Sequence, residues 1–120
     1  MKWEDFLGRN DIIGGDIQDQ EGEFIFRGPI EKIKMEDGFI KIYPRWIAKL
    51  TKHSDSKETW KSIEMLFNPL EIDTSKVRPQ NISEGRIFFS YPLLGNFTIF
   101  PKGDSKLDPK IVEGLTPDQY

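Results

Sequence analysis

Residues 23–50 read EFIFRGPIEKIKMEDGFIKIYPRWIAKL, and this stretch has the strongest secondary-structure signals of the chain. Apolar and polar residues alternate on both sides of Asp37-Gly38, a dipeptide typical of tight hairpin turns. The stretch therefore predicts two long antiparallel strands joined at that turn. One face of the second strand is predicted to carry the even-numbered apolar positions Ile40, Ile42, Trp46, Ala48 and Leu50.

The first strand of this hairpin changes phase part-way along its length. Apolar side chains favour even-numbered positions over residues 24–30 and odd-numbered positions over residues 33–35. A β-bulge near Glu31-Lys32, or a sharp bend at Gly28-Pro29, would return these side chains to one face. Bent and bulged strands are typical of small barrels. In the second strand, Pro44 indicates a free edge or another bulge.

Shorter elements are expected on both sides of the hairpin. We predict a helical turn in about residues 1–10 and a polar tail over about residues 104–120. Residues 59–67 fit either a strand or a helix, and we favour the strand because the neighbouring segments read as strands. Gly95-Asn96 is the expected turn of a second hairpin. Further strands are predicted at residues 70–73, 86–91 and 97–100.

These elements amount to five or six strands with little helix and no alternation of strands with long helices. We therefore predict one mainly-β domain over residues 1–120, built as a small, partly open antiparallel barrel of the SH3-like or OB-like kind. The run from Gly28-Pro29-Ile30 to Ile42 resembles the first hairpin of many SH3-like barrels. A compact β-sandwich is the alternative fold, and neither fold fixes a function.

The composition sets limits on location and chemistry. The chain has 120 residues, a net charge of −3 and no cysteine, which excludes disulfides, thiolate metal sites and a cysteine nucleophile. The lack of cysteine fits a reducing compartment, and the polar start does not resemble a signal peptide. No apolar run approaches the roughly 18 residues of a membrane span. We expect a cytoplasmic protein with no membrane partner.

The motifs of common enzymes and metal sites are missing. His53, the only histidine, lies in a polar stretch and is expected to be solvated. The acidic tract 16–23 has oxygen ligands at alternate positions, but Glu21 and Arg27 stand where a calcium loop needs glycine and an acid. We expect that tract to be a solvated loop. The sequence shows no phosphate loop, nucleophile elbow or paired carboxylates in an apolar setting. We therefore expect no catalytic activity, cofactor or metal.

Residues 27–61 are the only basic part of this acidic chain, with nine basic and five acidic side chains. Basic groups around an exposed ring are typical of single-stranded nucleic-acid binders. A solvated outer face that protects a strand edge would look the same, and the low pI of about 5.2 argues against nucleic acid. The candidate basic surface consists of Lys32, Lys34, Lys41, Tyr43, Arg45 and Lys49.

Large aromatic residues outside the first strand suggest a second kind of site. They could line a groove for an extended peptide, although large rings on strand faces are usually buried in the core. This candidate aromatic groove consists of Trp46, Trp60, Tyr91 and Phe97. The leading hypothesis is a non-enzymatic protein-interaction or adaptor module whose partner is a protein or peptide. The alternative is binding of RNA or single-stranded DNA through the basic surface.

Overall fold

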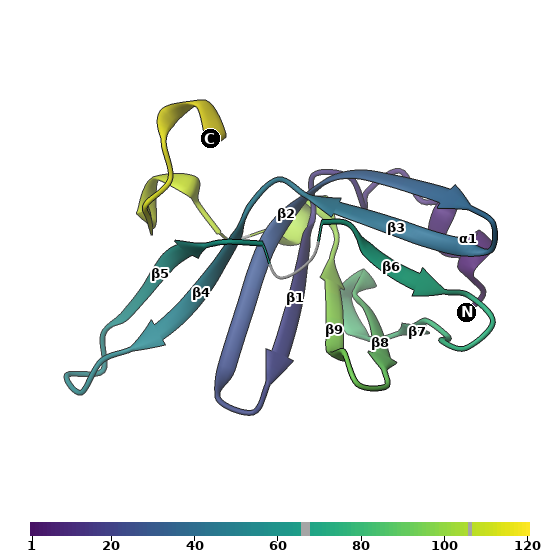
Figure 1. Ribbon diagram of the computed structural model, residues 1–120, viewed down its shortest axis with the longest axis horizontal. Helices are drawn as coiled ribbons and strands as arrows, with labels where there is room; N and C mark the ends of the chain where they lie inside the picture. Colours follow the sequence, from purple (N-terminus) through teal and green to yellow (C-terminus); the bar gives the residue numbers. More distant parts are fainter. Residues whose placement is uncertain (66–67, 106) are drawn as a thin grey trace.

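Strand β2 (Phe24–Glu36) lies at the centre of the fold and pairs with three other strands (Figure 1). The computed structural model describes residues 1–65, 68–105 and 107–120. Strand β1 (Asp16–Glu21) runs antiparallel along one edge of β2. Strands β3 (Phe39–Pro44) and β4 (Ile47–Lys52) follow one another along the other edge. The hairpin predicted from residues 23–50 is confirmed.

The turn and the bulge of this hairpin lie where the sequence predicts them. In the Asp37-Gly38 turn the two φ angles are 51° and 81°, the left-handed values that a two-residue hairpin loop of this kind requires. The register of β2 against β3 shifts between Ile30 and Lys32, which places one extra residue in β2. Beyond this bulge, Ile33 packs against the main core. The bulge thus keeps both halves of β2 facing the same apolar interior.

The second strand of the hairpin is divided in two. Strand β3 ends at Pro44, and β4 begins three residues later. Ile40 and Ile42 face the main core, whereas Trp46 and Ala48 belong to a second apolar cluster. The prediction that these even-numbered residues share one face is wrong, because the interruption after β3 changes which face the even-numbered side chains occupy.

The strands form one curved sheet that does not close. Its order is β10-β5-β4-β2-β1-β9-β8-β7, and β3 and β6 branch from β2. The mainly-β class is confirmed. The expected five or six strands are too few, because the sheet formed by the described residues has ten strands. Its shortest strands are too brief to show alternation in the sequence. The remaining strands are β5 (Glu58–Ile63), β6 (Leu70–Asp73), β7 (Gln80–Asn81), β8 (Ile87–Tyr91), β9 (Gly95–Phe100) and β10 (Val112–Glu113).

Several of the shorter elements also lie where the sequence predicts them. Helix α1 (Trp3–Leu7) is the predicted N-terminal turn. The favoured strand over residues 59–67 is confirmed for residues 59–63, which belong to β5. Residues 64–65 are not in a strand, and residues 66–67 lie outside the described residues. The second hairpin turns over residues 92–94, so Gly95 begins β9 and is not in the loop. Single 3₁₀ turns occur at Ser83–Gly85, Lys102–Asp104, Pro109–Ile111 and Pro117–Gln119.

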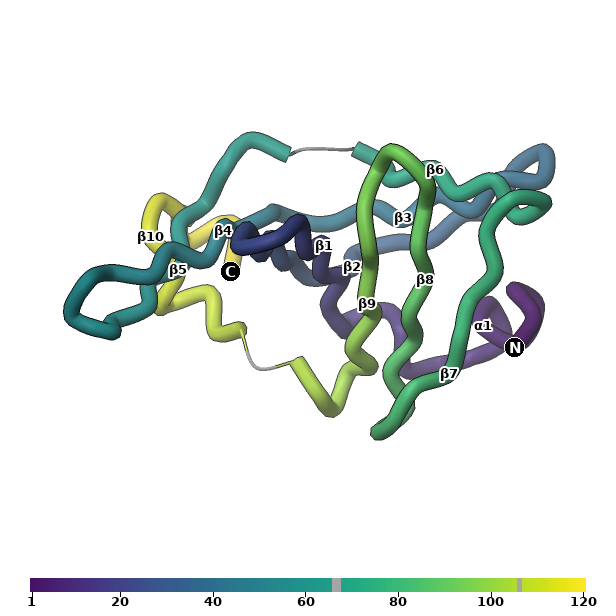
Figure 2. Tube along the Cα trace, turned by 90° about the horizontal axis from the view of Figure 1, so that it is seen from below, coloured from purple at the N-terminus to yellow at the C-terminus, as the bar shows by residue number. Residues whose placement is uncertain are grey.

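The main core lies inside the curve of the sheet, between β1, β9 and β8 on one side and β2, β3 and β6 on the other (Figures 1 and 2). Helix α1 closes one end of it. Since five residues cannot hold a helix in water, α1 depends on docking. The indole of Trp3 donates a hydrogen bond to the Val77 carbonyl (2.7 Å), and its ring meets the ring of Phe89 edge-on with 5.7 Å between centroids.

A second, smaller apolar cluster covers the wing formed by β4 and β5. It contains Trp46, Ala48 and Val112, with Trp60 packed against it. The C-terminal stretch predicted as a polar tail supplies part of this cluster, and β10 pairs parallel with β5. The Trp46 indole donates a hydrogen bond to the Gln119 carbonyl (3.2 Å). The C-terminal segment is therefore a packed cover for the wing.

Replacing Trp46 with phenylalanine is expected to lower the free energy of unfolding by about 1 kcal/mol, because the ring stays buried but the hydrogen bond to Gln119 is lost. The C-terminal segment should also become easier to cleave. Urea unfolding and limited proteolysis with mass spectrometry would measure both effects. Trp60→Phe is the matched control. Equal proteolysis of the two variants would contradict the anchoring role of Trp46.

Candidate functional site

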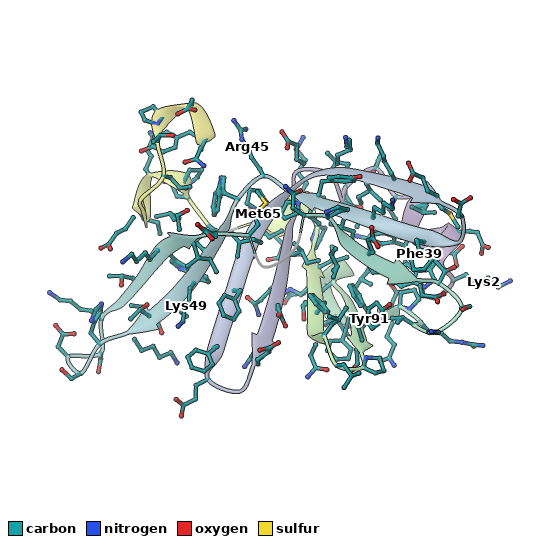
Figure 3. The ribbon with its side chains drawn as sticks, viewed as in Figure 1. Lys2, Phe39, Arg45, Lys49, Met65 and Tyr91 are labelled. Carbon is teal, nitrogen blue, oxygen red and sulfur yellow. The ribbon has the colours of Figure 1, made fainter. Side chains whose placement is uncertain are left out.

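A cleft of about 630 Å³ opens between β6, the tip of the β8–β9 hairpin and the β1–β2 hairpin. In Figure 2 the tip of the β8–β9 hairpin lies beside β6. The walls are mainly apolar, and Tyr91 lies on the hairpin side of the cleft (Figure 3). Leu93 and Leu94 stand at the lip, where their side chains are exposed. The described lining also includes two acids of β1, Asp19 and Glu21.

Asp19 is placed in this cleft by the pairing of β1. It lies opposite Phe26 of β2 and Phe97 of β9, and cross-strand partners share a face of the sheet. The residue is only 5% exposed, and its Oδ1 accepts no hydrogen bond from the described residues. A Cβ built on Gly95 would lie 2.5 Å from that oxygen, so glycine there leaves room for the carboxylate. The cleft thus contains a buried carboxylate oxygen without a donor.

The surroundings of Asp19 favour its neutral form. Burial and, to a smaller extent, the nearby charge of Glu21 together raise the pKa of Asp19 to about 6. At pH 7 the carboxylate is still mostly ionised, but it titrates only slightly below neutrality. A carboxylate of this kind attracts either a proton or a cation, because both satisfy a buried charge.

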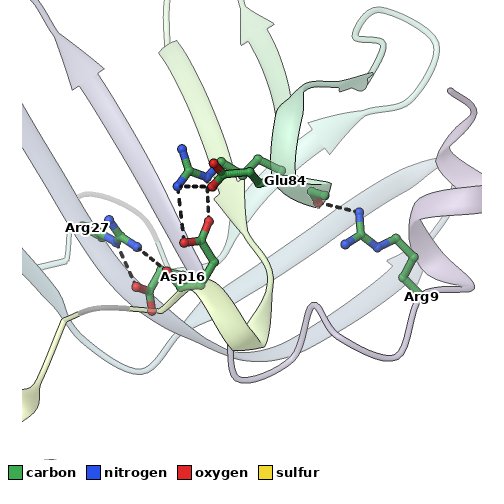
Figure 4. A network of polar contacts seen from close by, with 7 residues as sticks. Arg9, Asp16, Arg27 and Glu84 are labelled. Carbon is green, nitrogen blue, oxygen red and sulfur yellow. Dashed lines mark hydrogen bonds and ion pairs between the residues drawn. The ribbon is translucent and has the colours of Figure 1, made fainter.

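Asp16 on the same strand shows the contrasting arrangement. Its side chain is also buried, but its Oδ2 accepts a hydrogen bond from Arg27 Nε (2.8 Å; Figure 4). Its Oδ1 accepts one from Ser105 Oγ (2.9 Å). The Arg27 guanidinium also lies over the Phe100 ring, 3.9 Å from its centroid. Asp16 therefore links the C-terminal segment to the sheet through Ser105, whereas Asp19 makes no comparable contact.

The acidic tract 16–23 was expected to be a solvated loop, and that expectation is wrong. Residues 16–21 form β1 in the interior of the sheet, where Asp16 and Asp19 are buried, and only residues 22 and 23 lie in an exposed turn. One sequence signal could have indicated the site. Asp19 is two residues from Ile17, and alternate residues of a strand share a face, so a carboxylate lies in phase with an apolar core position. The burial of Asp16 and Asp19 can be predicted only if residues 16–21 are first recognised as a strand.

The charges that face the cleft are mainly negative. Asp19 and Glu21 come from β1, and Glu71 comes from β6. The described lining contains no basic side chain. Outside it, Lys41 Nζ lies 3.8 Å from Glu71 Oε1 and 2.9 Å from Glu36 Oε2. On β4, Lys49 lies opposite Phe26.

The candidate basic surface is divided between different parts of the molecule. Lys32 lies across from Tyr43 and Lys34 across from Lys41, on the outer face of β2 and β3. Two of these cations have internal partners. The Lys32 ammonium lies 4.5 Å from the centroid of the Tyr43 ring, and Lys41 pairs with acids.

The other two members of that surface lie further along the chain. Arg45 donates a hydrogen bond to the Asp118 carbonyl (3.1 Å) at the C-terminal segment. Lys49 is on the wing, where its ammonium lies 4.5 Å from the centroid of the Phe24 ring. Figure 3 shows Arg45 and Lys49 well apart. The structure therefore brings Lys32, Tyr43 and Arg45 together around one pocket and places Lys34 and Lys41 further along β2 and β3, whereas Lys49 is separate, on the wing.

The candidate aromatic groove is also divided. Trp46 is buried in the second cluster, and Trp60 packs against it there. Phe97 is buried in the main core, and Tyr91 packs against that core. The structure brings Tyr91 and Phe97 together in the lining of the cleft, and it places the two tryptophans in the wing.

The remaining candidate groups fall outside the cleft. His53 is exposed, and its Nε2 lies 3.0 Å from Thr59 Oγ1. Across residues 1–65, 68–105 and 107–120, no group of three or more His, Cys, Asp and Glu side chains is placed to hold a metal ion. In the same described residues, no helix is long and apolar enough to cross a membrane.

Comparison with protein-family models, with curated proteins and with solved structures found no match to this chain.

Proposed function

We propose that the protein is a non-enzymatic protein-interaction module that binds an extended segment of another protein in the cleft. The observation that carries this proposal is the buried carboxylate of Asp19, which has no donor for Oδ1 and lines an open, mainly apolar cleft. Unpaired buried charge is costly, and binding sites are places where such groups meet a ligand.

The lip of the cleft supports a protein partner. Leu93 is fully exposed and Leu94 is 46% exposed, side by side on a hairpin tip. Apolar side chains exposed together at the edge of a cleft are typical of interaction surfaces. In the described part of the chain, β6 pairs only with β3. The other edge of β6 can therefore offer backbone groups to an added strand, as in other domains that bind extended peptides.

We also propose that the fold is a small open barrel and that the protein is cytoplasmic. The strands β6, β3, β2, β1, β9 and β8 follow one another around the main core, as in a small barrel left open on one side. The opening lies between β6 and β8, where the cleft is. The absence of cysteine supports a reducing compartment.

Nucleic-acid binding through the basic surface is less well supported. Lys41 is already paired with Glu36 and Glu71, and the Tyr43 ring carries the Lys32 ammonium. These contacts use the charge and the ring that phosphates and bases would need. Salt-sensitive binding of oligonucleotides would be the result that favours nucleic-acid binding over peptide binding.

The test is selection of peptides from a displayed random library on the immobilised protein, followed by NMR mapping. Selected peptides are expected to shift the backbone amides of β1, β6 and the β8–β9 tip. Leu93→Asp is expected to weaken their binding by about tenfold or more, because it replaces an apolar contact with a charge. The side chain of Leu93 is fully exposed, so this change should leave folding intact.

Ile111→Asp is the matched control, because Ile111 is also an exposed apolar residue but lies on the C-terminal segment. It should leave peptide binding unchanged. If no selected peptide shifts the cleft amides, the proposal is wrong. If short oligonucleotides bind instead and lose affinity steeply with added salt, the alternative function is favoured.

A further inference from the structure

We propose that the cleft recognises a lysine side chain of its partner, with the ammonium group held by Asp19 and Glu21 and the methylene stem against the apolar walls. This inference rests on the proposed function and names the chemistry of the segment that would be bound. Its first support is charge, because the described lining contains three acids and no base. An acidic cleft attracts cationic ligands and repels anionic ones such as nucleic-acid phosphates.

The second support is the state of the Asp19 carboxylate. It is 95% buried as a residue and its Oδ1 has no donor among the described residues, whereas Asp16, on the same strand, has both oxygens satisfied. Because Oδ1 is buried, an ammonium group entering the cleft would approach the other oxygen of this carboxylate and offset its unpaired negative charge from there. Hydrogen bonds between charged groups in such settings are shorter and stronger than neutral ones.

The third support comes from the rings on the same face of the sheet. Phe26, Tyr91 and Phe97 line the cleft around Asp19. Lys49 already places its ammonium over the ring of Phe24, two residues from Phe26 on β2. That internal contact shows that this face can hold an ammonium against a ring. Rings and leucines also suit the four methylene groups of a lysine side chain.

The position of Asp19 favours lysine over arginine. The guanidinium group binds a carboxylate best through two parallel hydrogen bonds, one to each oxygen. Oδ1 of Asp19 is buried next to Gly95, where even a Cβ would come within 2.5 Å. A planar guanidinium group in the cleft therefore cannot form hydrogen bonds to both oxygens of Asp19. A compact ammonium needs only one oxygen of Asp19 and can use Glu21 as its second partner.

The test uses three blocked pentapeptides, acetyl-Gly-Leu-Xaa-Leu-Gly-amide, in which Xaa is lysine, arginine or norleucine. Binding is followed by the NMR shifts of the cleft amides at pH 7.5. The lysine peptide is expected to bind about tenfold or more tightly than the norleucine peptide, and also more tightly than the arginine peptide. Asp19→Asn should remove the advantage of lysine and leave the norleucine peptide unchanged. Glu113→Gln, an exposed acid of β10, should change neither affinity.

The pH dependence gives a second readout. Because the pKa of Asp19 is about 6, the affinity for the lysine peptide should fall as the pH is lowered from 7.5 to 5, while the norleucine peptide responds little. Glu21 and Glu71 also face the cleft, and Lys49 lies beyond Phe26. The Asp19→Asn variant isolates the contribution of Asp19 from theirs.

The outcomes separate this inference from the proposed function. If the lysine and norleucine peptides bind the cleft equally, or if arginine binds best, the lysine inference is wrong and the cleft remains a peptide site. If Asp19→Asn keeps the advantage of lysine, the inference is also wrong. If no peptide, including those selected from the library, shifts the cleft amides, both the inference and the proposed function fail.

Discussion

Replacing Gly28 with alanine is expected to destabilise the fold by about 3 kcal/mol or more, enough to leave much of the protein unfolded. Gly28 lies in β2, where the strand passes the junction between β3 and β4. A Cβ at this position would lie 1.9 Å from the Trp46 carbonyl oxygen and 2.9 Å from the Ile47 Cδ1 atom. The first of these atoms belongs to the backbone, so no rotation of a side chain relieves the overlap.

The consequence follows from the position of Gly28 in the hairpin. β2 can escape the overlap only by moving away from the β3–β4 junction, which would disturb its pairing with β4. Urea unfolding followed by tryptophan fluorescence would measure the loss. Gly103→Ala is the control, because a Cβ there meets no atom within 4 Å and the φ angle is not left-handed. If Gly28→Ala unfolded within 1 kcal/mol of the wild type, the close approach would be contradicted.

Asp19→Asn is expected to stabilise the protein at neutral pH by roughly 2 to 3 kcal/mol. The pKa of Asp19 is raised from the ordinary value of 3.8 to about 6, and each unit of difference corresponds to about 1.4 kcal/mol between the two charge states. The charged carboxylate therefore destabilises the folded state above pH 6. Asparagine has nearly the same shape and does not ionise.

The size of the effect depends on pH. Between about pH 4 and pH 6 the folded protein keeps the Asp19 proton after the unfolded chain has released it. The folded state thus binds more protons, and this group makes stability fall as the pH rises through that window. The difference between variant and wild type should be near zero below pH 4 and should reach its full size above pH 6.

Urea unfolding at several pH values from 3.5 to 7.5 would measure this difference. Asp73→Asn is an informative comparison, because hydrogen bonds from Ser75 lower the pKa of Asp73. Its carboxylate stabilises the fold above its unfolded pKa, so its replacement should destabilise the protein at neutral pH. A stabilisation by Asp19→Asn that did not vary with pH would show that the titration of Asp19 is not its cause.

The two roles of Asp19 connect stability with the proposed binding. The same substitution is expected to stabilise the free protein and to remove its preference for lysine. Binding sites commonly retain groups that lower stability, because those groups are needed for a ligand. An Asp19 variant with higher stability and unchanged affinity for the lysine peptide would separate the two roles and leave the carboxylate without a ligand.

The sequence predicts the centre of the fold well because its signals there are local. The dipeptide Asp37-Gly38 specifies the hairpin turn, and the change of phase after Ile30 specifies the bulge. Both depend only on neighbouring residues and on the period of a strand. The strand β5 was also identified by its neighbours, in spite of an equally good helical pattern.

The parts that were missed depend on contacts between distant residues. Periodicity cannot show that the strand is interrupted at Pro44 and that Trp46 then faces a different cluster. The acidic strand β1 has the composition of a loop, and its burial results from pairing with both β2 and β9. The cleft follows from the same pairing, since Asp19 meets Phe97 only when β9 lies next to β1.

The two apolar clusters have a consequence for how the molecule opens. The wing of β4 and β5 is held by the smaller cluster and by a C-terminal cover that pairs with it over two residues. The main core contains most of the buried side chains and contributes Leu70 and Phe97 to the lining of the cleft. Amide hydrogens of the wing should therefore exchange with solvent through local opening, at lower free energy than those of β1, β8 and β9. The wing can unfold locally as a cooperative unit while the residues around the cleft stay folded.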